Sequence, residues 1–234
     1  MGVETWEWWV VVYILPGIAI VVLSFRDRRQ ARPGFKLFLS NWPFAIASVS
    51  QMAVLRSERL MLPFLAGPAA LGVYVVVATA TEPLLWVAQA LTDTRVARSD
   101  GLLRWREQFR TFVRDGVVFA FVAGIGGVLL YLLLEPVFGS EYADGKVLVL
   151  PLCVAGVALA LYRQAAGLAL VHLGGKVLGV AEGGIAVLAI GIYGFAISQY
   201  SALGAAWGSV VTYIVAVIIL VVVTVLKRSK NPKH

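Results

Sequence analysis

Charged residues are scarce in this sequence. Only 14% of its 234 residues are Asp, Glu, Lys or Arg, whereas a soluble domain averages about 25%. Apolar residues take their place, making up 60% of the chain and giving a mean hydropathy of +0.85. Because the apolar residues form several runs long enough to cross a bilayer, the sequence indicates an all-α integral membrane protein with several spans.

Cysteine and histidine are also scarce. The single cysteine, Cys153, lies inside an apolar run, so neither a disulfide framework nor a zinc site can be built from it. The two histidines are His172, beside a predicted loop, and His234. No HExxH, GxSxG or P-loop pattern is present, nor is a cytoplasmic Asp-rich pair suited to metal-dependent transfer. We therefore expect no enzyme activity, no metal and no cofactor.

We also expect no cleavable signal peptide. The chain begins with acidic residues, Glu4 and Glu7, where a signal peptide would be basic. No small-x-small cleavage site follows the first apolar run. We therefore expect this run to be retained as a helix.

Seven apolar segments, each about 18–25 residues long, have the length that a hydrocarbon core of about 30 Å requires. The first span and its basic linker form one region, residues 1–34, and the other six form a lobe over residues 35–234. Within that lobe, residues 95–114 are predicted to form an amphipathic helix on the membrane surface. The predicted spans cover about residues 8–25, 35–55, 69–91, 116–134, 147–171, 177–197 and 203–226.

The basic residues are distributed unequally between the loops. The net charge of +7 would suggest nucleic acid binding in a soluble chain, but here orientation in the membrane explains it better. We therefore expect no nucleic acid partner. With the N-terminus outside, the cytoplasmic segments hold sixteen of the twenty lysines and arginines, which predicts an N-out, C-in topology. These segments are 26–36, 92–115, 172–176 and 227–234, with five, six, one and four basic residues respectively.

Three ionisable residues lie well inside predicted spans: Glu82, Arg163 and Glu182. Each costs at least about 2.5–3.5 kcal/mol at membrane depth, so each needs a partner or a function. One interpretation places them along a hydrophilic cavity, where Arg163 binds an anionic group of a substrate and a carboxylate couples to an ion or proton. The other is a buried pair, of Arg163 with Glu82 or Glu182, that holds the helices together.

Further polar residues allow the same two interpretations. Arg56, Glu58 and Arg59 are expected at the outer end of the second span. They form either a solvated cluster at headgroup level or a cationic rim for a phosphate-bearing lipid. Four uncharged residues line the same cavity or hydrogen-bond between helices: Asn41, Gln51, Gln89 and Gln164.

Glycines recur at the spacing that helix–helix contacts use. We expect them to allow close approach of neighbouring helices rather than to bind a substrate. They are Gly124 and Gly127, then Gly175, Gly179 and Gly183, and finally Gly204 and Gly208.

Four further segments, in three regions of the chain, carry a resemblance. Ser57-Glu58-Arg59-Leu60-Met61-Leu62 precedes a helix that starts at Leu71-Gly72-Val73-Tyr74. Val137-Phe138-Gly139-Ser140-Glu141-Tyr142-Ala143 lies in an outer loop, and Leu203-Gly204-Ala205-Ala206-Trp207-Gly208 begins the last span. In this order and spacing they resemble the polysaccharide flippases of the multidrug/oligosaccharidyl-lipid/polysaccharide exporter superfamily. The likeness covers nearly the whole chain, aligned to the second half of that family.

The resemblance implies the C-terminal lobe of a two-lobed transporter of the bacterial cytoplasmic membrane. Such proteins flip polyprenyl-pyrophosphate-linked oligosaccharides outward by alternating access, for polysaccharides such as O-antigen and exopolysaccharide. The implied partners are membrane lipid, the lipid-linked oligosaccharide, and a second lobe or second copy of the chain, because such transporters bind substrate between repeats. Cationic cavity residues are typical of the family, and Arg163 and Arg56 are the candidates for them here.

Two alternatives remain open. A cation-coupled multidrug-type exporter of the same fold would use Glu82 or Glu182 as its coupling carboxylate. The chain could also be a non-transporting scaffold or remnant in a polysaccharide assembly complex. Substitutions in its cavity would then have no effect, whereas substitutions at its glycine contacts would impair it. A rhodopsin is excluded, because the last predicted span contains no lysine to bind retinal.

Overall fold

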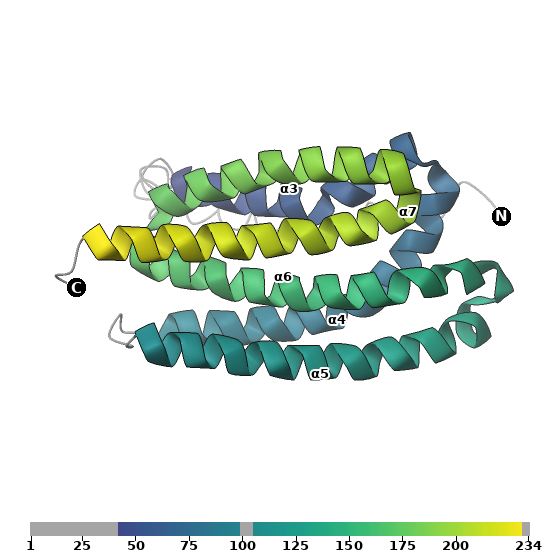
Figure 1. The fold of residues 1–234 in the computed structure, drawn as a ribbon, viewed down its shortest axis with the longest axis horizontal. Coiled ribbons are helices and arrows are strands. Elements are labelled where there is room, and N and C mark those ends of the chain that lie inside the picture. Colours follow the sequence, from purple (N-terminus) through teal and green to yellow (C-terminus); the bar gives the residue numbers. More distant parts are fainter. Residues whose placement is uncertain (1–41, 99–104, 231–234) are drawn as a thin grey trace, which may run out of the picture. The chain divides into compact units, whose positions relative to one another are not determined.

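The computed structural model describes residues 42–98 and 105–230, which are helical almost throughout (Figure 1). The chain divides into two compact units, Met1–Trp42 and Pro43–His234, and the described residues belong almost entirely to the second. No strand occurs among them, which confirms the all-α class for this part of the chain. In chain order the elements are α3 (Trp42–Leu65), α4 (Pro68–Arg98), α5 (Trp105–Phe138), the short 3-10 helix η1 (Ser140–Gly145), α6 (Lys146–Leu173) and α7 (Gly175–Lys230).

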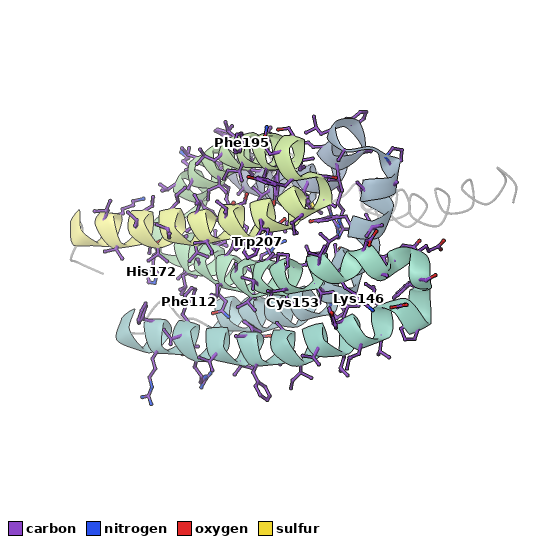
Figure 2. All side chains as sticks on the ribbon, turned by 45° about the vertical axis from the view of Figure 1, so that its right-hand side comes forward. Phe112, Lys146, Cys153, His172, Phe195 and Trp207 are labelled. Atoms are coloured by element: carbon purple, nitrogen blue, oxygen red, sulfur yellow. The ribbon has the colours of Figure 1, made fainter. Side chains whose placement is uncertain are left out.

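Large apolar side chains cover the outer faces of these helices. Phe121, Val180 and Phe195 are 69%, 79% and 70% exposed. Figure 2 labels Phe195, on the first part of α7. Apolar exposure on this scale suits a lipid environment better than water, and it supports a membrane location. Three segments of the described chain are long and apolar enough to cross a membrane: Phe109–Phe138, Ser140–Leu173 and Gly175–Lys227.

The predicted count of seven spans is not supported by these three segments. The first predicted span, residues 8–25, lies outside the described residues, as do Asn41 and the boundary between residues 34 and 35. The predicted second and third spans correspond to α3 and α4, which are not among the three segments. The N-out, C-in orientation stays a prediction.

The longest helix, α7, is a hairpin of two helices that meet at Ser201. This residue has φ 53° and ψ −134°, which interrupts the helix and lets the chain turn back on itself (Figure 1). We call residues 175–200 the first arm and residues 202–230 the second arm. The arms touch closely, because a Cβ at Gly204 would collide with the carbonyl oxygen of Ala196. The sixth and seventh predicted spans correspond to these arms.

Helix α6 contacts α4, α5 and α7. Its buried face carries many alanines, including Ala155, Ala158 and Ala169, whose small side chains let neighbouring helices approach. Helix α5 runs antiparallel to α6, because its Gly127 lies against Cys153, near the start of α6, and its Gly116 lies against Leu161 further along (Figure 2).

Helix α3 runs parallel to the first arm of α7. Pro43 near its start faces Gly179, where a Cβ would lie 2.7 Å from the Pro43 carbonyl oxygen, and Met61 near its end faces Gly194. The chain then reverses at Gly67, whose φ of 90° favours glycine, and α4 begins at a proline, the residue preferred in a first helical turn.

Helix α3 extends past residue 55, where the second predicted span ends. It continues to Leu65, so Arg56, Glu58 and Arg59 lie within the helix, while the end of the membrane span itself stays a prediction. Their charges meet a partner on α4, which local hydropathy along α3 cannot register. Charged residues inside a helix of this kind are retained when another helix neutralises them.

The predicted amphipathic segment, residues 95–114, includes residues 99–104, which are not among those that the structure describes. Residues up to Arg98 belong to α4, and residues from Trp105 form the first turns of α5. At this end of α5, Asp115 is buried, so the helix already packs against its neighbours there. A surface location for residues 95–114 stays a prediction.

The glycine contacts are confirmed at four of the predicted positions. A Cβ would come within 3.1 Å of a neighbouring helix or arm at Gly127, Gly179, Gly204 and Gly208. Gly124 differs, because a Cβ there would meet no atom within 4 Å. Spacing alone therefore predicts which glycines lie on one helix face, but not which of them contact another helix.

Candidate functional site

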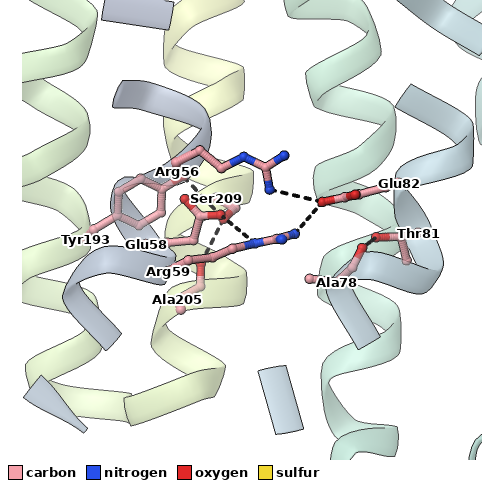
Figure 3. Close-up of polar contacts among 9 residues, drawn as sticks. All are labelled: Arg56, Glu58, Arg59, Ala78, Thr81, Glu82, Tyr193, Ala205 and Ser209. Atoms are coloured by element: carbon pink, nitrogen blue, oxygen red, sulfur yellow. Dashed lines mark hydrogen bonds and ion pairs between the residues drawn. The ribbon is translucent and has the colours of Figure 1, made fainter. Parts of the chain in front are cut away.

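Two arginines of α3 converge on one carboxylate of α4. Arg59 Nη2 lies 2.6 Å from Glu82 Oε1, and Arg56 Nη1 lies 3.2 Å from the same oxygen (Figure 3). The arginines are three residues apart on α3, and this spacing places them on one helix face. Hydrogen bonds between ionised groups are shorter and stronger than neutral ones, so these contacts tie α3 to α4.

A second carboxylate lies beside this triad. Glu58 is 3% exposed, and its Oε1 lies 3.8 Å from Arg59 Nε. Its Oε2 is buried and has no hydrogen-bond partner among the residues that the structure describes. We call Arg56, Glu58, Arg59 and Glu82 the charged cluster; with both carboxylates ionised its formal charge is zero.

The charged cluster lines a cavity of about 70 Å³ between α3, α4, α6 and α7. Its other polar wall residues are Tyr74, Thr81, Ser209 and Tyr213, and Gly156 of α6 contributes to the apolar wall. A buried water needs about 10–15 Å³ of such volume, so the cavity has room for a few waters. It is far smaller than the roughly 300–1,000 Å³ that a pocket for a small organic ligand provides.

A group of buried hydroxyls adjoins the cavity. The Tyr193 hydroxyl donates to Ser209 Oγ at 3.3 Å, and Ser209 Oγ donates to the Ala205 carbonyl at 3.0 Å (Figure 3). Tyr213 stacks on Tyr162 of α6, with ring centroids 6.3 Å apart and planes 8° from parallel. These tyrosines were not among the site residues predicted from the sequence. Their position in the middle of apolar spans was the available signal, because a phenol hydroxyl at membrane depth needs a partner.

Glu182 is the centre of a second polar site. It lies on the first arm of α7, is 1% exposed, and accepts a hydrogen bond on Oε2 from the Tyr162 hydroxyl. Its Oε1 is buried without a hydrogen-bond partner among the described residues. Arg163 acts on Glu182 electrostatically, and Gln51 of α3 interacts with the Tyr162 hydroxyl.

Gln164 belongs to neither of these sites. Its Nε2 donates to Asp115 Oδ2 at 3.2 Å, and Asp115 Oδ1 lies 3.6 Å from Arg114 Nε. This contact joins α6 to α5 and agrees with the interpretation of Gln164 as a helix–helix hydrogen-bonding residue.

The structure therefore separates the predicted site residues into three groups. Arg56, Arg59 and Glu82 share the cavity, Arg163 and Glu182 lie near a second centre, and Gln164 binds Asp115. Within the described residues, no group of three or more His, Cys, Asp or Glu side chains is suited to hold a metal ion.

No family model, curated protein or solved structure matches this chain. The flippase resemblance therefore stays a prediction. Of the segments on which it rests, Ser57 to Leu62 lies within α3. Leu71-Gly72-Val73-Tyr74 lies in the first turns of α4, with Tyr74 on the cavity wall. Val137 to Ala143 joins α5 to η1, and Leu203 to Gly208 starts the second arm of α7.

Proposed function

We propose that this chain is a membrane transport protein of polysaccharide biosynthesis that moves a polyprenyl-pyrophosphate-linked oligosaccharide across the bacterial cytoplasmic membrane. The observation that carries the proposal is the convergence of Arg56 and Arg59 on one oxygen of Glu82, beside a cavity between four helices. Paired guanidinium groups suit the planar, multidentate binding of phosphate. Glu82 takes the place of a phosphate oxygen while no substrate is bound.

The exchange of one anion for another explains how such a site works at membrane depth. An arginine without a partner is costly in a low-dielectric interior. In the closed conformation Glu82 pairs with both arginines, and the cavity of about 70 Å³ excludes a headgroup. Opening of the bundle separates α3 from α4, and the pyrophosphate then replaces Glu82. Arg56, whose side chain is 49% exposed, is the first to meet it.

The proposal includes the predicted seven-span, N-out, C-in topology and a role as one lobe of a transporter. Transporters with internal repeats bind their substrate between the repeats. A second lobe or a second copy of this chain therefore completes the path for the sugar, and the charged cluster binds the phosphate.

Native mass spectrometry of the tagged chain, extracted gently from its own membranes, tests this proposal first. We expect a complex with a second helical lobe, or a homodimer, that carries a polyprenyl-phosphate lipid. Arg59→Ala should lose that lipid, whereas the matched control Lys146→Ala should keep it, because Lys146 pairs with Glu135 away from the cavity. A wild-type chain that carries only bulk phospholipid contradicts the proposal.

A flipping assay in liposomes then measures the activity itself. The isolated complex is reconstituted with a labelled polyprenyl-pyrophosphate oligosaccharide, and the exposure of the label to an external quencher is followed. We expect Arg59→Ala to abolish flipping and Arg59→Lys to restore only part of it, because lysine cannot bind two oxygens with a planar fork. Wild-type rates in Arg59→Ala would remove this residue from the mechanism.

A further inference from the structure

An open groove lies between the two arms of α7, on an outer face of the bundle. Its volume of about 840 Å³ falls within the range of about 300–1,000 Å³ that ligand pockets occupy. Val180, Gly184 and Leu188 of the first arm form one wall, and Ile219 and Val223 of the second arm belong to the other. Apart from Lys176, the described residues that line the groove carry no polar side chain.

Both walls of the groove end at a lysine. Lys176, at the start of the first arm, lines the groove itself. On the second arm, Ile219, Val223 and Lys227 follow one another at intervals of four residues, which places them along one helix face. The Lys227 ammonium donates to the carbonyl of Leu173, just before the first arm begins, at 3.2 Å. The two lysines therefore lie at the same end of the hairpin (Figure 1).

This end of the groove is also where the apolar part of α7 begins and ends. The segment that is long and apolar enough to cross a membrane runs from Gly175 to Lys227. The lysines thus stand at the level of lipid headgroups, and the apolar walls extend from there along the hydrocarbon. Within the part of the chain that the structure describes, no acidic side chain forms an ion pair with Lys176.

We propose that this groove binds one anionic glycerophospholipid, with the phosphate against Lys176 and Lys227 and an acyl chain between the two arms. The lysines select the headgroup, since each lysine near the membrane surface favours an anionic lipid by about fivefold. The apolar walls give no such selection, because acyl chains are as apolar as the side chains around them. The walls instead set where the acyl chain lies.

A second copy of the chain would also fit an apolar groove, but the charge favours a lipid. In a symmetric dimer both copies use the same surface patch. The twofold axis of a dimer in a membrane stands along the membrane normal, so the Lys176 ends of the two grooves would lie side by side. Like charges placed together are unfavourable, whereas a lipid phosphate neutralises them.

A lipid in this groove would hold the two arms of α7 together. Each arm supplies one wall, so the bound acyl chain contacts both and opposes their separation. The lipid site is separate from the cavity at the charged cluster, because the described residues that line the groove include none of those that line that cavity. The inference therefore does not depend on the proposed function.

Native mass spectrometry of the purified full chain tests the lipid site. The chain is delipidated in detergent and titrated with phosphatidylglycerol or with phosphatidylcholine of the same acyl chains. We expect one phosphatidylglycerol to be retained per chain, with an affinity about tenfold or more above that of phosphatidylcholine. Lys176→Gln should lower the affinity for phosphatidylglycerol about fivefold. The matched control, Lys146→Gln, should leave it unchanged, because Lys146 pairs with Glu135 at the start of α6.

A second variant tests the walls of the groove. A Cβ at Gly184 would meet no atom within 4 Å, so the ring in Gly184→Phe can extend into the groove without displacing other side chains. We expect it to lower the affinity for phosphatidylglycerol about fivefold or more, because it takes the volume that the acyl chain needs. Gly191→Phe is the matched control on the same arm. A Cβ at Gly191 also meets open space, and Gly191 is not among the residues that line the groove.

Thermal unfolding in detergent gives an independent readout. Phosphatidylglycerol should raise the Tm of the wild type and of Gly191→Phe but not that of Gly184→Phe, since a ligand stabilises only the state that binds it. Lys176→Gln changes an exposed side chain, so it tests the site even if Gly184→Phe fails to fold.

Three results would overturn the inference. The first is equal affinity of the wild type for phosphatidylglycerol and phosphatidylcholine, and the second is wild-type affinity for phosphatidylglycerol in either Lys176→Gln or a folded Gly184→Phe. The third is a groove occupied by something else: a dimer, or a polyprenyl phosphate bound in preference to phosphatidylglycerol, that is lost in Gly184→Phe. The flipping assay with Arg59→Ala measures the proposed function separately, so either proposal can fail alone.

Discussion

Arg59 and Glu82 form the shortest ion pair of the charged cluster, with 2.6 Å between Nη2 and Oε1. The pair joins the C-terminal third of α3 to the middle of α4, and each side chain is only 22% exposed. Glu58, the other carboxylate beside Arg59, lies on the same helix as Arg59 and is more distant, at 3.8 Å from Arg59 Nε. The bundle therefore contains a charged contact between helices whose outer faces are apolar, and this contrast makes the cluster a place where helix movement and ligand binding can be linked.

Loss of the Glu82 charge should weaken the bundle. In Glu82→Gln both arginines lose this ionised partner and Arg59 keeps only the more distant Glu58, while the shape of the side chain is kept. We expect the free energy of unfolding to fall by about 2 kcal/mol, between the values for exposed and for fully buried pairs. Chemical unfolding in detergent micelles measures the change.

Glu135→Gln is the matched control for that experiment. Glu135 also forms a 2.6 Å pair, with Lys146, but its side chain is 47% exposed. Solvent screens such a pair, so we expect a clearly smaller loss of stability. Equal losses in the two variants would show that the charged cluster is as solvated as the surface pair.

The turn of α7 should tolerate no side chain at Gly204. In Gly204→Ala the new methyl group would collide with the Ala196 backbone, which cannot rotate away as a side chain would. We expect the free energy of unfolding to fall by about 1–3 kcal/mol or more. In the control, Gly124→Ala, the methyl group meets nothing and helix propensity improves, so stability should hold or rise by up to about 1 kcal/mol. A Gly204→Ala protein as stable as the wild type would mean that the two arms lie further apart.

The fold class and the membrane character could be predicted from the sequence, because both follow from the length and frequency of apolar runs. The partner of Arg56 and Arg59 could not be predicted, because Glu82 lies more than twenty residues away and on another helix. Hydropathy along α3 counts the charge of Arg56 but not the neutralising carboxylate on α4.

The candidate site was predicted in part. Buried charge alone identified Glu82, Arg163 and Glu182, since each is costly at membrane depth. The tyrosines at 162, 193 and 213 were missed, because tyrosine is compatible with both apolar packing and hydrogen bonding, and only the three-dimensional neighbours decide between them.

The predicted orientation has a direct test in the labelling of single cysteines. In a Cys153→Ala background, Ser140→Cys should react with a membrane-impermeant maleimide in intact cells, because residue 140 lies in the segment predicted to face outside. Lys176→Cys should react only after the membrane is permeabilised, because the bias of basic residues places 172–176 inside. The reverse pattern would exclude the N-out, C-in topology and the lobe that the proposed function assumes.

The contact of Gly127 with Cys153 should behave as a coupled pair. A Cβ at Gly127 would lie 2.8 Å from Cys153 Sγ, so Gly127→Ala forces α5 and α6 apart, and we expect a loss of about 1–3 kcal/mol. Cys153→Ala removes the obstructing sulfur, and in the double variant it should restore most of that loss. The four free energies of unfolding then give an interaction energy of about 1 kcal/mol or more. At Gly127 the obstructing atom belongs to a side chain, so a second substitution can remove it and restore stability. At Gly204 the obstructing atom belongs to the backbone, and no substitution removes it. Strictly additive effects at Gly127 and Cys153 would mean that the two helices do not meet at these residues.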